Sequence, residues 1–286
     1  MYVITLSTIP PRFPFVGDIL QTLLRQTKRP ERVVLYLPRR YRRFPDYDGA
    51  LPEVPPGVEI RLVDEDIGPA TKVLYAAEEF RGSGLRLLYC DDDRLYQRDW
   101  AAKLLRAARR HPEAAITAGG FDLDHLGMTP GSDLPRFAAY GYKRRDLYYR
   151  INRLRDKIAA FPNKPQGPKP PRGIFRRSGF ADIAEGYGGV LVRPEFFEPG
   201  DRVIPPVMWA VDDIWLSGLM AMRGIPIWLE AGAMRLRTAP VQHQDALYAA
   251  VIDGATRNQA NRLCAAHMRD RFGIWGGTAP ELAEAV

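Results

Sequence analysis

The chain has 286 residues, of which 46% are hydrophobic and 26% are charged, so it is long enough to bury the core of one large α/β domain or two small ones. Its formal net charge of +7 favours anionic partners such as nucleotide phosphates, acidic lipid surfaces or nucleic acid. No apolar run approaches the ~20 residues of a membrane span, and the two cysteines form neither a disulfide framework nor a metal-type pair, so we expect a cytoplasmic protein, at most peripheral to the inner face of the membrane.

Strand and helix patterns alternate through the first part of the chain. Buried strands are predicted at residues 2–6, 32–37, 58–63, 85–89 and 114–118, and amphipathic helices at 15–26, 68–80 and 100–111. Polar, proline-containing loops are predicted at residues 7–12 and 38–56. The strand–helix–strand rhythm predicts parallel strand pairing with right-handed crossovers, so we expect a single domain with an insertion.

Three consecutive carboxylates follow the predicted strand at 85–89. In extended backbone Asp91 and Asp93 project to the same side, and the ligand crevice of an open α/β sheet lies outside the carboxyl ends of its strands. Hard oxygen ligands select Mg²⁺ or Mn²⁺, which commonly bridge protein carboxylates to nucleotide phosphates. The alternative interpretation of this triplet is a solvated acidic turn.

Residues 126–179 break the alternation. This segment mixes tyrosines with many arginines and lysines and includes a proline-rich run at 161–171, a composition that cannot bury a core of its own. We therefore expect an insertion or lid beside the crevice. Basic residues interleaved with aromatic ones could also bind single-stranded nucleic acid, but no nucleic-acid module accompanies them, so nucleic acid is not an expected partner.

Two further motifs follow the insertion. Gly188 and Gly189 lead into a predicted strand at 190–192, and paired glycines permit either close backbone approach to a ligand or merely a tight turn. Asp212 and Asp213 open a helix that runs to residue 222, with Asp212 as its expected N-cap. A last strand is predicted at 226–229.

Beyond that strand, His243 lies in a polar turn, where an exposed histidine is the alternative to a metal ligand. The rest of the chain is predicted to be helical and peripheral.

The order of these motifs resembles the GT-A glycosyltransferases, in particular the family 2-like bacterial enzymes, which use nucleotide-sugar donors. A strand that ends in Asp-Asp-Asp, a Gly-Gly loop that enters a strand, and an Asp-Asp pair that opens a helix carry this resemblance. It implies a GT-A-type, Rossmann-like, mostly parallel sheet flanked by helices in a single domain. The catalytic domain would then span residues 1–245, with the insertion at 126–179, and residues 246–286 would form a C-terminal helical extension.

Site residues are carried over from the resemblance by position. Asp213 matches the catalytic base of the acidic pair, which is commonly Glu-Asp in that family and is completed here by Asp212. The metal ligands implied are Asp91, Asp93 and His243. Donor contacts are expected from Thr8, Ile9, Pro10, Arg12, Asp64, Asp66, Lys72, Asp91 and Asp92, and acceptor-side contacts from Gly188, Gly189 and Trp215.

The resemblance implies metal-dependent transfer of a sugar from a nucleoside diphosphate donor, expected to be a UDP-sugar, to a hydroxyl group with inversion. The cofactor would be Mn²⁺ or Mg²⁺, the acceptor a saccharide or a lipid-linked molecule, and the process polysaccharide biosynthesis.

The same motifs are also compatible with other functions. In a haloacid-dehalogenase-like phosphatase, Asp91 and Asp93 would be nucleophile and general acid, but the usual following threonine is missing and several strand–helix units precede the motif. A nucleotidyltransferase would likewise use strand-end carboxylates with a divalent ion, and a non-catalytic basic binding protein would use only the positive charge of the chain.

Overall fold

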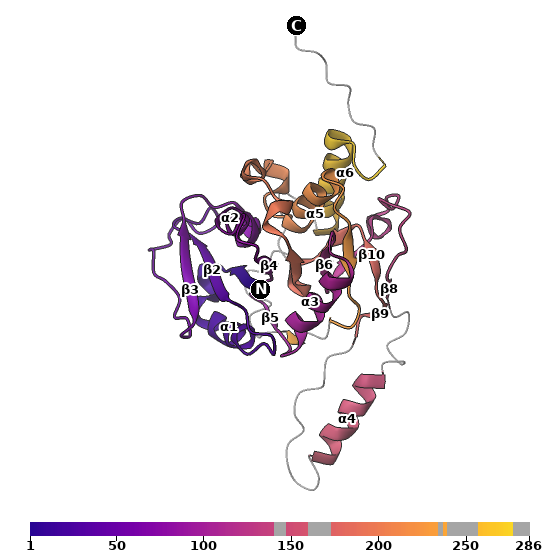
Figure 1. The fold of residues 1–286 in the computed structure, drawn as a ribbon. Helices are drawn as coiled ribbons and strands as arrows, with labels where there is room; N and C mark the ends of the chain where they lie inside the picture. The colour runs from indigo at the N-terminus through magenta and orange to yellow at the C-terminus, as the bar shows by residue number, and fades with distance from the viewer. Residues whose placement is uncertain (140–146, 160–172, 234–236, 239–256, 277–286) are drawn as a thin grey trace.

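Eight strands of the computed structural model form one central sheet in the order β10-β13-β6-β12-β4-β1-β2-β3 (Figure 1). The structure describes residues 1–139, 147–159, 173–233, 237–238 and 257–276. The strands of this sheet are β1 (Tyr2–Ser7), β2 (Arg32–Pro38), β3 (Val58–Val63), β4 (Arg86–Tyr89), β6 (Ala115–Thr117), β10 (Gly179–Ala181), β12 (Val190–Val192) and β13 (Ile227–Leu229). Strands β3, β2, β1 and β4 run parallel to one another, whereas β12 is antiparallel to both β4 and β6.

Helices cover both faces of this sheet. The helices of the described residues are α1 (Val16–Leu24), α2 (Thr71–Glu79), α3 (Trp100–Arg110), α4 (Leu147–Ala159), α5 (Asp212–Met222) and α6 (Arg257–Phe272), of which α4 stands apart from the sheet (Figure 1). Helices α2 and α5 lie on one side of the sheet and α1 and α3 on the other (Figure 1). The predicted fold class, a mostly parallel α/β sheet flanked by helices, is therefore confirmed.

Short elements complete the described chain. Three two-stranded ladders pair β5 (Arg94–Leu95) with β14 (Arg237–Thr238), β7 (Gly120–Phe121) with β11 (Ile183–Ala184), and β8 (Ala138–Ala139) with β9 (Phe175–Arg177). The 3₁₀-helices are η1 (Pro10–Phe15), η2 (Gly68–Ala70), η3 (Leu123–Leu126), η5 (Gly186–Gly188), η6 (Pro194–Phe196), η7 (Pro199–Arg202) and η8 (Pro206–Met208). The expectation that the strand at 226–229 would be the last was wrong, since β14 follows it.

The core lies where the apolar runs of the sequence are longest. Val3, Ile4 and Leu6 of β1 are completely buried, as expected for a strand with neighbours on both edges and helices on both faces. Helix α6 joins this core through Cys264 and Met268, and Met268 occupies the space that a side chain at Gly218 of α5 would need. Its apolar face is thus buried against α5, and the helix is less peripheral than the sequence indicated.

The strand order creates a switch point between β1 and β4. The chain leaves β1 through α1 to reach β2 on one side, and it arrives at β4 from β3 through α2 on the other side. In open α/β sheets, ligands bind outside the carboxyl ends of the strands at such a reversal. Residues 8–12 follow β1 and residues 91–93 follow β4 at this edge.

An ion-pair cluster ties the ends of the 126–179 segment to the sheet. Arg136 Nη1 lies 3.0 Å from Asp122 Oδ1 and 2.8 Å from Asp182 Oδ1, while Asp182 Oδ2 accepts hydrogen bonds from the backbone N–H groups of Leu123 and Gly131. Phe175, also from this segment, is buried in the core. Burial raises the pKa of Asp122 to about 6, and the charge of Arg136 opposes that shift.

This raised pKa predicts a pH-dependent stability. The folded protein binds more protons than the unfolded chain between about pH 4 and 6, so the contribution of Asp122 to the free energy of unfolding falls as pH rises through that window. Asp122→Asn removes this ionisation, and its stability relative to wild type should rise by on the order of 1–3 kcal/mol between about pH 4 and 7 in urea titrations. Asp124→Asn, at an exposed position, is the control; equal pH profiles for both variants would contradict the prediction.

Candidate active site

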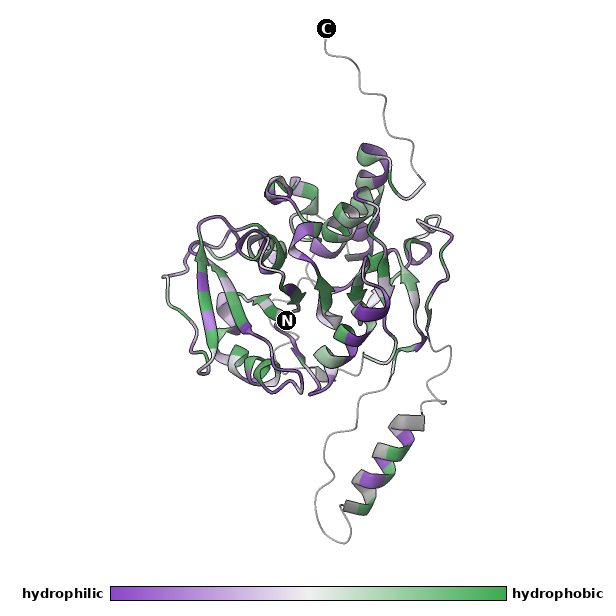
Figure 2. Cartoon of the chain, viewed as in Figure 1, coloured by the Kyte–Doolittle hydropathy of each residue, from purple (hydrophilic) through white to green (hydrophobic). Residues whose placement is uncertain are grey.

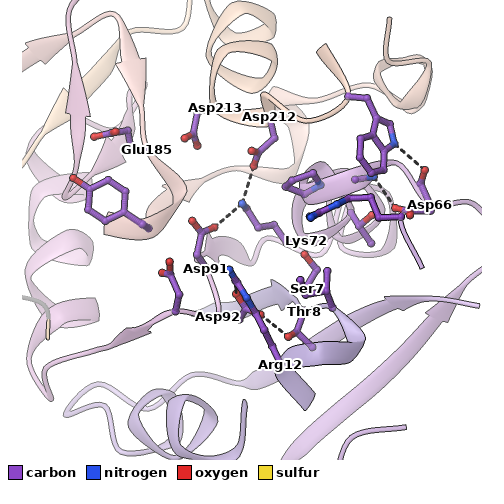
Figure 3. Close-up of a pocket in the computed structure, with 18 of the residues that line it drawn as sticks. Ser7, Thr8, Arg12, Asp66, Lys72, Asp91, Asp92, Glu185, Asp212 and Asp213 are labelled. Atoms are coloured by element: carbon purple, nitrogen blue, oxygen red, sulfur yellow. Dashed lines mark hydrogen bonds and ion pairs between the residues drawn. The ribbon is translucent and has the colours of Figure 1, made fainter. Parts of the chain in front are cut away.

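A cavity of about 410 Å³ opens at the carboxyl ends of β1 and β4 (Figure 3). Its volume falls within the range of about 300–1,000 Å³ typical of small-molecule sites. The walls come from the ends of β1 and β4, the start of α2, the turn before β12 and the start of α5. Segments far apart in the sequence therefore meet at the edge where the strand order predicts a ligand.

Asp92, the middle carboxylate of the triplet, is turned toward β1. Its side chain is almost completely buried and accepts hydrogen bonds from Thr8 Oγ1 and Arg12 Nη1. Burial raises the pKa of Asp92, while the charge of Arg12 opposes that effect. Asp92 thus joins the end of β4 to the end of β1 and to η1. The sequence predicted extended backbone here, but Asp92 and Asp93 lie in a turn.

Asp93 carries a poorly compensated charge. Among the described residues, its buried Oδ1 has no hydrogen-bond partner, and Arg94 Nε lies 3.5 Å away. Burial first, and then the neighbouring charge of Asp91, raise the pKa of Asp93 to about 6. The strand end therefore favours a further cation beside Asp93.

Lys72 bridges two of the predicted site motifs. Its ammonium group, with only 3% of the residue exposed, lies 2.6 Å from Asp91 Oδ1 and 2.7 Å from Asp212 Oδ2 (Figure 3). Burial alone would lower the pKa of Lys72, but the charges of Asp212, Asp91 and Asp213 raise it well above its ordinary value. The predicted N-cap role of Asp212 is wrong, since Val211 is the N-cap and Asp212 is the first helical residue.

Asp213 also faces the cavity from the first turn of α5. Its Oδ1 accepts a hydrogen bond of 2.9 Å from the backbone N–H of Gly186, at the turn before β12. Gly186 must lack a side chain, because a Cβ there would lie 2.8 Å from Asp91 Oδ1 and 2.9 Å from Lys72 Nζ. Glu185 and Tyr187, on either side of this glycine, line the cavity as well.

Gly188 and Gly189, predicted to contact the acceptor, are tightly packed against the backbone of Gly119 and the ring of Trp100. A Cβ at Gly188 would collide with the backbone of Gly119, and one at Gly189, where φ is +84°, would collide with the ring of Trp100. Neither glycine lines the cavity. The turn that contains them reaches the site through Glu185 and Tyr187.

The remaining predicted residues divide into two groups. Thr8, Ile9, Arg12 and Asp66 line the cavity, whereas Pro10, Asp64 and Trp215 do not. Asp64 is exposed beside Arg39, and the Trp215 indole is buried, where its Nε1 donates a hydrogen bond to the Asp201 carbonyl. For Trp215 the reason is helical geometry, which turns it about 200° away from Asp213. His243 lies outside the described residues.

Sequence analysis missed an aromatic wall of the cavity. Tyr41 and Phe44 line it from the segment after β2, which was predicted only as a surface loop, and Tyr41 Oη donates a hydrogen bond to the Thr8 carbonyl. Trp209 lines the cavity as well, and the guanidinium of Arg42, from the same segment as Tyr41, lies 5.1 Å from its ring centroid. The clustering of Tyr41, Phe44 and Tyr47 directly after a strand was the available signal.

The carboxylates fit a divalent cation bound jointly with a ligand. No group of three or more His, Cys, Asp or Glu side chains in the described ranges could hold a metal by itself. Mg²⁺ is usually held by one or two carboxylates together with substrate phosphates and water, and Asp91 and Asp93 provide that number. The observation that favours such an ion is that the buried Asp93 Oδ1, with Arg94 Nε at 3.5 Å, accepts no hydrogen bond from any described residue.

Comparisons with known proteins give little beyond this geometry. No family model and no curated protein sequence matches the chain. The crystal structure of GalNAc-T7 with UDP, GalNAc and Mn²⁺ is similar at a TM-score of 0.47 and 12% identity, covering 94% of this chain and 47% of that one. The crystal structure of S. aureus TarS 1–349 in complex with UDP is similar at a TM-score of 0.40 and 9% identity, covering 80% and 57%.

The chain thus spans about half the length of the solved structures it matches. Their TM-scores indicate a loose likeness in architecture, which assigns no function to this chain.

The Lys72 bridge predicts a large loss of stability when the ammonium group is removed. In Lys72→Met the carboxylates of Asp91 and Asp212 face each other without a cation, so the free energy of unfolding should fall by about 3–5 kcal/mol in urea titrations with EDTA. Lys103→Met is the matched control: Lys103 pairs with the exposed carboxylate of Asp99, and its loss should cost under about 1 kcal/mol. Similar losses for both variants would contradict the bridge's importance.

Proposed function

We propose that the chain is a glycosyltransferase that moves a sugar from a UDP-sugar to a hydroxyl acceptor. The observation that supports this most is the meeting of Asp91, Asp93 and Asp213 at one cavity beside the β1–β4 switch point. These are the residues for which the GT-A resemblance implies metal binding and base catalysis. Sugar transfer from a nucleoside diphosphate requires a metal site, which the carboxylates at the end of β4 would provide, and a carboxylate from another element to act as base.

The nucleoside would bind along the β1 side of the cavity. Thr8, Ile9 and the aromatic side chains of Tyr41 and Phe44 provide a surface on which a planar base can stack while polar groups fix its orientation. The guanidinium of Arg12, held against Asp92, adds positive charge at the same end. The diphosphate would then extend toward Asp91 and Asp93.

The metal would be held by Asp91 and Asp93. One oxygen of Asp91 is bound to Lys72, so the other is the one offered to the ion. A bound Mn²⁺ or Mg²⁺ supplies positive charge that neutralises the leaving diphosphate. The buried lysine fixes Asp91 in position, so the carboxylate does not have to reorganise when the donor arrives.

Asp213 would take the proton from the acceptor hydroxyl as that oxygen attacks the anomeric carbon. The Gly186 N–H fixes one carboxylate oxygen of Asp213 and thereby orients the side chain. The new glycosidic bond forms as the bond to the diphosphate breaks, which gives inversion in a single displacement. Glu185, on the same wall, is suited to accept a hydrogen bond from another acceptor hydroxyl.

Donor binding is the first test. UDP with Mn²⁺ at about 100 times its Kd should stabilise the protein by about 2.7 kcal/mol and raise Tm by about 5–10 °C, and EDTA should abolish the shift. Asp93→Ala should lose this response because it removes a metal ligand, whereas the exposed control Asp124→Ala should keep it. If no nucleoside diphosphate changes Tm, the glycosyltransferase proposal fails; hydrolysis of phosphate esters without nucleotide binding would favour a phosphatase.

Base catalysis is the second test. Asp213→Asn should lower the rate of UDP release from a reactive UDP-sugar by about 10²–10⁴-fold, because the asparagine amide cannot accept the proton. Its UDP affinity by calorimetry should stay near the wild-type value. Asp270→Asn, on the exposed side of α6, serves as the control. Wild-type turnover by Asp213→Asn would remove that carboxylate from the chemistry.

A further inference from the structure

Helix α4 carries an exposed apolar stripe. Ile151, Leu154 and Ile158 are 51%, 59% and 66% exposed, and their spacing of three and four residues places them on one face of the helix. Figure 2 shows apolar and polar residues alternating along this helix. Single exposed apolar side chains are normal on protein surfaces. A stripe of three in successive turns indicates instead a surface that binds another protein or a membrane.

The body of the described protein does not cover this stripe. Helix α4 stands apart from the central sheet and its flanking helices in Figure 1. Burial of the exposed part of these side chains in an apolar environment would release free energy in proportion to the area covered. The stripe is therefore a source of binding free energy that the described fold leaves unused.

Basic residues border the stripe. Arg150 and Arg155 are exposed, and at about 100° per residue they fall on opposite edges of the apolar face. The helix sequence contains Arg150, Arg153, Arg155 and Lys157 against a single acidic residue, Asp156. An apolar stripe between cationic edges complements an anionic bilayer, where the stripe enters the acyl boundary and the guanidinium groups meet lipid phosphates.

Length and charge favour a bilayer over a second copy of the chain. Thirteen residues are fewer than two heptads, whereas a stable coiled coil needs three to four, and two copies would bring like-charged arginines together. The helix would span about 20 Å, less than the roughly 30 Å of a hydrocarbon core, and none of the described helices is long and apolar enough to cross a membrane. Such a helix lies in the plane of the interface.

We propose that α4 anchors this protein to membrane surfaces rich in anionic phospholipid, with Ile151, Leu154 and Ile158 inserted among the lipids and Arg150 and Arg155 bound to headgroup phosphates. This inference does not rest on the proposed sugar transfer. It adds a location, because an enzyme held at a lipid surface meets lipid-linked or surface-bound substrates at a raised local concentration.

Vesicle co-sedimentation with the full chain tests the proposal. Wild type should bind vesicles of phosphatidylcholine with about 30% phosphatidylglycerol and bind pure phosphatidylcholine at least about tenfold more weakly. The triple variant Ile151→Asn, Leu154→Asn, Ile158→Asn should lose at least about tenfold in affinity without a change in Tm, since the replaced side chains are exposed. Leu263→Asn, which removes a leucine 57% exposed on α6, should bind like wild type.

The charges are tested separately. Arg150→Gln with Arg155→Gln should weaken binding to anionic vesicles by on the order of 10-fold to 30-fold, and salt should weaken wild-type binding.

Three results would overturn the proposal. The first is that wild type does not sediment with anionic vesicles at all. The second is that the triple apolar variant binds as tightly as wild type, which would assign binding to the general positive charge of the protein. In the third, light scattering shows a wild-type dimer that the triple variant dissociates, which would mean that a second copy covers the stripe. UDP-dependent thermal shifts of the same variants report donor binding independently of all three results.

Discussion

The buried ammonium group of Lys72 is the interaction on which the candidate site depends. It lies between Asp91, at the end of β4, and Asp212, at the start of α5, and so holds together two elements that are far apart in the sequence. Without that cation, several carboxylates around one cavity would repel each other in a medium that screens charge poorly. Gly186 permits the arrangement, because a larger residue there would displace both the lysine and Asp91.

The three aspartates of the acidic triplet, although identical and adjacent in sequence, have three different environments. Asp91 is paired with a buried lysine, Asp92 is sealed against Thr8 and Arg12, and Asp93 keeps an oxygen without a hydrogen-bond partner among the described residues. Asp92 and Asp93 lie in a turn after β4, and there the middle residue points to β1. One side chain therefore fastens the strand ends together, while its neighbours stay available for a ligand.

The segment between β7 and β10 has two parts with different environments. At its base, Arg136 binds Asp122 and Asp182 and fastens the segment to the sheet, and Phe175 packs into the core. Farther out, α4 exposes its apolar stripe instead of burying it. Among the described residues, 126–179 contributes nothing to the cavity wall, so its interpretation as a lid or acceptor region stays a prediction.

The sequence by itself determined the elements and the chemistry near them. Apolar runs and helical periodicity predicted β1, β2, β3, β4 and α1 to α3 closely, and the acidic triplet was placed correctly at a strand end, because these features depend on neighbours in the chain.

Only the tertiary structure decided which side chains meet. The Lys72 bridge, the hydrogen bonds of Asp92 to Thr8 and Arg12, the contact of Asp213 with Gly186 and the contact of Tyr41 with Thr8 join residues between 19 and 140 positions apart, and no local pattern encodes such a distance. Gly188, Gly189 and Trp215 do not line the cavity, and the sequence could not show this, since a glycine pair or a helical tryptophan looks alike in sequence whether it faces a ligand or the core.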